Sequence, residues 1–87
     1  MKQVEEIVFN ELINFYRYCL SDKCEFVTRK MFARTIYEKY IGMKNILSDD
    51  CVNMVAGMMN FYIDSEKFPV PDIGDIEERI EHIKRRL

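Results

Sequence analysis

Two segments of this chain show the helical pattern of apolar residues, and in each the apolar arc covers most of the helix circumference. At about 100° per residue, five polar side chains of residues 2–20 fall within a stripe roughly 80° wide, and apolar side chains take nearly all of the rest. These polar residues are Gln3, Glu6, Asn10, Asn14 and Arg17. Residues 49–64 repeat the arrangement, with a narrow polar stripe made of Asp49, Asn53, Asn60 and Asp64. A chain of 87 residues is expected to have difficulty burying two such helices by itself, so the pattern predicts self-association.

The length and composition are those of a single folded domain. With 87 residues the chain has room for one hydrophobic core, and its 48% hydrophobic content is higher than that of disordered chains. Thirteen basic and fifteen acidic side chains give a formal charge of −2. A charge so close to zero produces no overall attraction to nucleic acid or to an anionic membrane. Binding to either is therefore expected only through a local surface.

Cysteine usage and the absence of long apolar runs predict a cytoplasmic protein. Cys19, Cys24 and Cys51 are an odd number of cysteines without a repeated spacing, which is typical of free thiols in a reducing compartment. The first residues lack the apolar core of a signal peptide, and no stretch approaches the roughly 20 apolar residues of a membrane span. We therefore expect no membrane association.

The chain is predicted to form one helical domain, residues 1–87. Its expected helices cover residues 2–20, 28–41, 49–64 and 73–87. Thr28 is the expected N-cap of the second helix, which stops at Gly42. Ser48 is the expected N-cap of the third helix, whose acidic first turn complements the helix dipole. No alternating run is long enough for a sheet, so the predicted fold class is an all-α bundle of about four helices.

The last predicted helix follows a stiff linker and has the clearest pattern. Prolines interrupt helical geometry in the linker Phe68-Pro69-Val70-Pro71. The apolar residues after it are spaced 3, 4, 3 and 4 apart, which matches a narrow a/d seam. They are Ile73, Ile76, Ile80, Ile83 and Leu87. The seam predicts docking on the rest of the bundle or on a second subunit, and Glu81 is expected to pair with Arg85.

Metal binding and catalysis both lack a convincing motif. The donor atoms of a tetrahedral zinc site are present in Cys19, Cys24, Cys51 and His82. Structural zinc ligands come in close pairs, however, and only the first two of these residues are near each other. His82 and Glu78 lie one helical turn apart, yet both fall on the polar face of a charged helix. We therefore expect no metal, no cofactor and no catalytic residue, and an enzyme is the least favoured class.

Positive charge is concentrated in the second predicted helix. The predicted partner-binding residues are Arg29, Lys30, Arg34 and Lys39. Such a basic face can meet nucleic-acid phosphates, and the third helix after it allows a helix-turn-helix. The connection of residues 42–48 is longer than the usual turn, and Asp49 and Asp50 would repel the DNA backbone. A small dimeric helical DNA-binding regulator is therefore the alternative, and an acidic protein surface is the preferred partner.

A methionine group in the third predicted helix indicates a second contact surface. Met54, Met58 and Met59 surround the small pair Ala56-Gly57. Methionines adapt to varied partners, and small residues let another helix approach closely. Packing inside a single chain explains these residues equally well. The predicted self-association residues are Met54, Met58, Met59, Ile76, Ile80 and Ile83.

The function predicted from these patterns is binding rather than chemistry. No motif in the chain carries an activity, whereas two helix faces have the composition of contact surfaces. We therefore expect a homodimeric, non-enzymatic adaptor, regulator or inhibitor that binds a macromolecule. A protein partner is preferred over nucleic acid.

Overall fold

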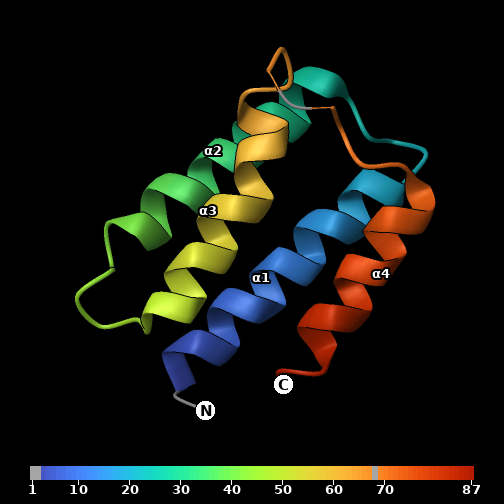
Figure 1. Cartoon of the computed structure of the whole chain (residues 1–87). Helices are drawn as coiled ribbons and strands as arrows, with labels where there is room; N and C mark the ends of the chain where they lie inside the picture. Colours follow the sequence, from blue (N-terminus) through green and yellow to red (C-terminus); the bar gives the residue numbers. More distant parts are fainter. Residues whose placement is uncertain (1–2, 68) are drawn as a thin grey trace.

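The computed structural model describes residues 3–67 and 69–87, and within these ranges it contains four α-helices and no strand (Figure 1). The helices are α1 (Gln3–Leu20), α2 (Phe26–Ile41), α3 (Asp49–Ile63) and α4 (Ile73–Lys84). The all-α, four-helix prediction is therefore confirmed. The predicted start of the first helix at residue 2, and Phe68 of the linker, lie outside the described residues.

Helix α1 organises the bundle. It packs against α2 and against α4, while α2 also packs along α3. Aromatic rings connect α1 to α3 as well, because Phe15 and Tyr16 both contact Tyr62 edge to face. Figure 1 shows α2 and α4 on opposite flanks, with α1 and α3 between them. The outer faces of α2 and α4 therefore point away from each other.

Local capping determines where two of the helices begin. The Ser48 hydroxyl accepts a hydrogen bond from the Cys51 amide at 3.2 Å, so the predicted N-cap of α3 is confirmed. The carboxylate of Asp72 does the same for α4, accepting from the Asp75 amide at 2.9 Å. Helix α4 ends at Lys84, three residues before the predicted end, because Leu87 is half-exposed and has too little packing to hold the last turn.

The predicted start of α2 at Thr28 is wrong. The helix begins at Phe26, and Glu25 occupies the N-cap position without a side-chain hydrogen bond. The Glu25 amide instead donates to the Tyr18 hydroxyl at 3.0 Å, which fixes the entry of the chain into the helix two residues earlier. Gly42 ends the helix as predicted, but with a right-handed φ of −63°, so the ending does not use the left-handed freedom of glycine.

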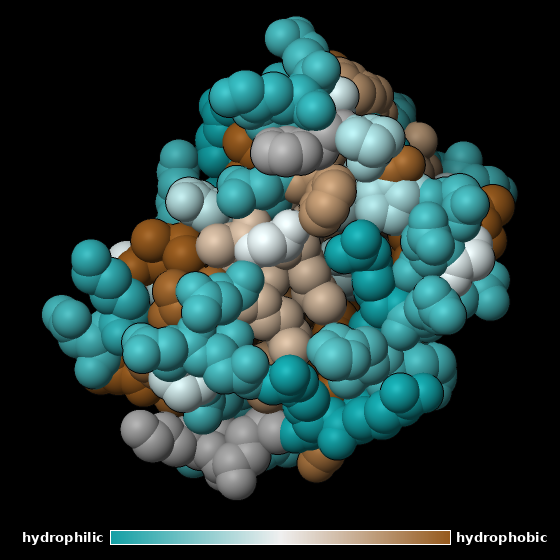
Figure 2. Space-filling model, viewed as in Figure 1, coloured by the Kyte–Doolittle hydropathy of each residue, from teal (hydrophilic) through white to brown (hydrophobic). Residues whose placement is uncertain are grey.

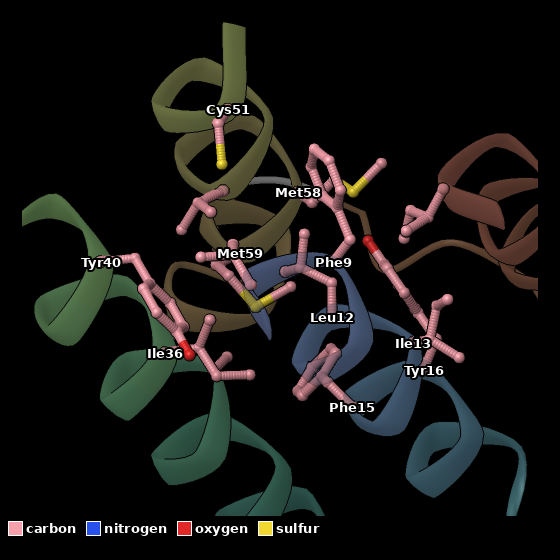
Figure 3. Close-up of a cluster of buried hydrophobic side chains, with 14 of the residues drawn as sticks. Phe9, Leu12, Ile13, Phe15, Tyr16, Ile36, Tyr40, Cys51, Met58 and Met59 are labelled. Carbon is pink, nitrogen blue, oxygen red and sulfur yellow. The ribbon is translucent and has the colours of Figure 1, made fainter. Parts of the chain in front are cut away.

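The expected difficulty of burying both broadly apolar helices within one chain is not seen, because most of their apolar side chains are buried. Most of the apolar arc of α1 is buried, and its side chains point toward those of α2, α3 and α4 in the core (Figure 3). The buried α1 residues are Val8, Phe9, Leu12, Ile13, Phe15 and Tyr16. Those of α3 are Cys51, Val55, Met58, Met59 and Tyr62. The polar stripe of α1 faces solvent as predicted, and Ile7 and Leu20 are its exposed large apolar residues.

The isoleucine seam of α4 docks on the chain's own bundle. Ile76, Ile80 and Ile83 are buried, and α4 packs against α1. Met58 and Met59 are also buried, which leaves Met54 as the half-exposed member of the predicted self-association set. Self-association stays a prediction, and because these side chains already pack within one chain, it requires another surface.

Candidate interaction surfaces

The four basic residues predicted to bind a partner do not form one surface. Lys30 and Arg34 lie one turn apart on the outer side of α2. Arg29 turns inward, with its guanidinium carbon 5.4 Å from the ring centre of Phe26 and 5.5 Å from that of Tyr62. Lys39 lies on a third side of the helix, where its ammonium is 3.4 Å from the Glu11 carboxylate of α1. Only Lys30 and Arg34 therefore share a face.

Two apolar side chains accompany this pair of cations. Val27 is 65% exposed and Met31 is 64% exposed, although both are in a regular helix. In the described part of the chain, neither Lys30 nor Arg34 takes part in an ion pair. Like charges spaced four residues apart destabilise a helix by about 0.2–0.5 kcal/mol. We call these four residues the α2 patch: Val27, Lys30, Met31 and Arg34.

A second surface is the groove between α3 and α4. Two open depressions, of about 710 Å³ and about 300 Å³, adjoin each other here and share Met58 and His82 in their walls. Arg86 joins the two helices at one end through an ion pair with Asp50. At the other end the Arg79 guanidinium carbon lies 5.0 Å from the Phe61 ring centre. Figure 2 shows an apolar band across the middle of this face, bordered by hydrophilic residues.

Gly57 stands in the wall of this groove, in the middle of α3. It is exposed, and a Cβ atom built on it meets no side chain and no neighbouring helix within 4 Å. Glycine in a helix interior costs about 0.5–1 kcal/mol relative to alanine. Nothing in the fold of the single chain compensates for this cost.

Replacing Gly57 with alanine is therefore expected to raise the free energy of unfolding by about 0.5–1 kcal/mol. Urea denaturation followed by circular dichroism measures the change. Gly42→Ala is the matched control and should gain less, because a Cβ at Gly42 approaches the Glu38 carbonyl oxygen to 3.2 Å and that oxygen must shift. A loss of stability in Gly57→Ala would show that the space beside Gly57 is occupied.

Glu5 is a structural residue that the sequence did not reveal. An acidic residue in the first turn of a helix is ordinarily solvated, yet Glu5 is buried. Its carboxylate accepts hydrogen bonds from the Ser48 amide, at 3.1 Å, and from the Ser48 hydroxyl. Glu11 has a similar role farther along α1, because it accepts from the Tyr40 hydroxyl and pairs with Lys39. Both contacts link segments that are distant in sequence, and no local sequence pattern predicts them.

The residues considered for zinc binding are not brought together. Cys19 and Cys24 lie at the junction of α1 and α2, whereas Cys51 is buried in the first turn of α3, near Glu5. Among the described residues, no three His, Cys, Asp or Glu side chains are placed to hold a metal ion. Burial raises the pKa of Cys19 to about 12 and that of Cys51 to about 11. Both thiols therefore lose their protons less readily than an ordinary cysteine.

The acid–base pair considered for catalysis is open to solvent. His82 and Glu78 are exposed on α4, in the wall of the larger depression. Glu81 pairs with Lys84 at 3.5 Å, rather than with Arg85 as predicted.

No helix in the described ranges combines the length and the apolar content needed to cross a bilayer. Comparisons with protein-family models, with curated proteins and with solved structures found no match to this chain.

Proposed function

We propose that the protein is a non-enzymatic interaction protein, an adaptor, regulator or inhibitor that binds a macromolecular partner through the α2 patch. The observation that supports this is the pairing of two cations without ion pairs, Lys30 and Arg34, with two largely exposed apolar side chains, Val27 and Met31. Interfaces combine apolar contact with charged groups that set orientation, and arginine is enriched in them. The fold of the chain itself does not require this arrangement.

The charge of the α2 patch favours an acidic protein surface over duplex DNA. Proteins that bind DNA commonly neutralise about 6–10 phosphates, whereas the patch offers two cations. Asp49 and Asp50 are exposed at the start of α3, where a helix-turn-helix would meet the DNA backbone. In a chain of net charge −2, the patch acts over roughly a Debye length, about 8 Å at physiological salt. Its partner must therefore present negative charge at close range.

Reversing both charges of the patch, in Lys30→Glu/Arg34→Glu, is expected to weaken partner binding about tenfold or more, mostly through a slower association rate. The effect should shrink as salt is added, since screening weakens the attraction in the wild type. Wild-type and variant protein are immobilised and used to capture partners from a lysate of the native host, and the association rate of each captured partner is then measured by surface plasmon resonance.

Lys44→Glu/Lys67→Glu is the matched control, because it makes the same change in net charge at two exposed lysines outside the patch. Circular dichroism confirms that each variant keeps its helices. Capture that is equal for the wild type and the patch variant would overturn the proposal. Micromolar binding to random duplex DNA that disappears in Lys30→Glu/Arg34→Glu would instead establish the alternative, a DNA-binding regulator.

A further inference from the structure

The outer side of α2 carries a regular row of four residues. They follow one another at intervals of four, which is the spacing of a ridge on a helix surface. Along the chain the row reads apolar, positive, positive, negative, and three of its members are exposed while Lys30 is half-buried. We call this row the α2 ridge: Phe26, Lys30, Arg34 and Glu38.

The exposed surface of α4 carries a row with the same spacing and the opposite charges, and Glu77, Glu81 and Arg85 of this row line the larger depression. The row reads apolar, negative, negative, positive, and all four members are exposed. Its last residue follows the helix directly and keeps helical geometry, with φ −64° and ψ −18°. We call this row the α4 ridge: Ile73, Glu77, Glu81 and Arg85.

We infer that the α2 ridge of one copy of the protein docks along the α4 ridge of a second copy. In a parallel alignment of the two helices, every position of one ridge meets its complement. The pairs are Phe26 with Ile73, Lys30 with Glu77, Arg34 with Glu81, and Glu38 with Arg85. This inference rests on the proposed function, because it names the occupant of the same side of α2.

The orientation of the two helices follows from the order of the charges. An antiparallel alignment still pairs the two middle positions, but it places Phe26 against Arg85 and Glu38 against Ile73. The parallel alignment satisfies all four positions. Two ridges of spacing four pack side by side when their helices cross at about −50°, the commonest packing of helices in globular proteins. The spacing of the two ridges is therefore compatible with this packing.

The two ridges do not meet within one chain, because α2 and α4 occupy opposite flanks of the bundle (Figure 1). Each copy thus presents one ridge of each kind, and a pair of copies joined by one contact still has one free α2 ridge and one free α4 ridge. Such a head-to-tail contact produces a ring or an open chain of copies, not the symmetric dimer expected from the sequence. The surface pair between Glu81 and Lys84, at 3.5 Å, is weak enough to be exchanged for Arg34.

Sedimentation velocity of the wild type tests this inference. At about 0.01 M salt and tens of micromolar protein, the mean mass is expected to exceed the 10.5 kDa of one chain and to increase with concentration. At about 0.15 M salt or above it should decrease, since screening weakens all three charge pairs. A wild type that stays monomeric throughout would overturn the inference. Partner capture that still depends on Lys30 and Arg34 would in that case leave the proposed function standing.

Charge reversal identifies the two ridges. Lys30→Glu/Arg34→Glu and Glu77→Lys/Glu81→Lys are each expected to weaken self-association about tenfold or more, while Lys44→Glu/Lys67→Glu leaves it unchanged. Combining both reversals in one chain should restore association, because the two ridges are then complementary again with the charges exchanged. Association that persists in both reversed variants, or that the combined variant fails to restore, would overturn the inference. If a reversed variant loses its helices, Lys30→Gln/Arg34→Gln provides the same comparison without new charge.

Discussion

Replacing Phe15 with alanine is expected to lower the free energy of unfolding by about 3–5 kcal/mol. Phe15 is fully buried, and its ring makes edge-to-face contacts with Tyr16, Phe32 and Tyr62 at centroid distances of 5.4, 5.2 and 4.8 Å. These partners come from three different helices, so no single side chain can move in to fill the cavity. Urea denaturation at fixed protein concentration measures the loss. Domains of ordinary stability have only about 5–15 kcal/mol in total, so the variant should be close to unfolding.

The control for this prediction is the exposed phenylalanine Phe26. Its ring is 55% exposed and contacts the Arg29 guanidinium, so Phe26→Ala should cost less than about 1 kcal/mol. Both variants remove the same aromatic ring from a helix. Equal losses of stability in the two would mean that Phe15 is not at the centre of the core.

Those parts of the fold that depend on local chemistry were predicted from the sequence. Ser48 is followed by an acidic first turn, and a hydroxyl at that position caps the helix with no help from the rest of the chain. The predicted start of α2 was wrong because the observed start depends on a tertiary contact, in which the Tyr18 hydroxyl accepts a hydrogen bond from the Glu25 amide. The same holds for Glu5, whose partner Ser48 is 43 residues away in the sequence. Such contacts exist only once the helices have packed.

The burial of α1 was misjudged for a geometrical reason. A helical wheel gives the width of an apolar arc, but the number of helices that will cover it depends on topology. Because α1 has neighbours on three sides, a wide arc is what a central helix requires, and no second chain is needed to cover Phe9 or Ile13. The width of the arc alone is therefore no argument for a dimer.

Part of the candidate surface could be predicted from the sequence. Successive residues of a helix are separated by about 100°, so Arg29 and Lys30 cannot share one face, and this was visible in the spacing. The inward turn of Arg29 and the pairing of Lys39 with Glu11 depend on neighbouring helices. The complementary order of charges on the two ridges was also present in the sequence. Only the structure shows that all but one of these side chains are exposed, and that α2 and α4 lie on opposite flanks of the bundle.

The proposed function depends on this distinction between side chains that the fold uses and those that it does not. The isoleucines of α4 and most methionines of α3 are buried within the chain, so they contribute to stability. Lys30, Arg34, Val27 and Met31 are largely outside the core, where a helix of a lone domain would favour charges of mixed sign. Variants of the buried residues should therefore change the free energy of unfolding, whereas variants of the surface residues should change association.

On α4, the buried Ile80 and the exposed Ile73 test this difference between stability and association. Ile80 is 8% exposed within the seam, so Ile80→Ala is expected to cost about 2–4 kcal/mol, and Ile80→Asp more, because a carboxylate would be buried without a partner. Ile73 is 66% exposed on the same helix, so Ile73→Asp should leave the melting temperature nearly unchanged while weakening self-association. Thermal unfolding at low protein concentration measures the first effect and sedimentation the second. An unchanged melting temperature in Ile80→Asp would mean that α4 does not dock on α1.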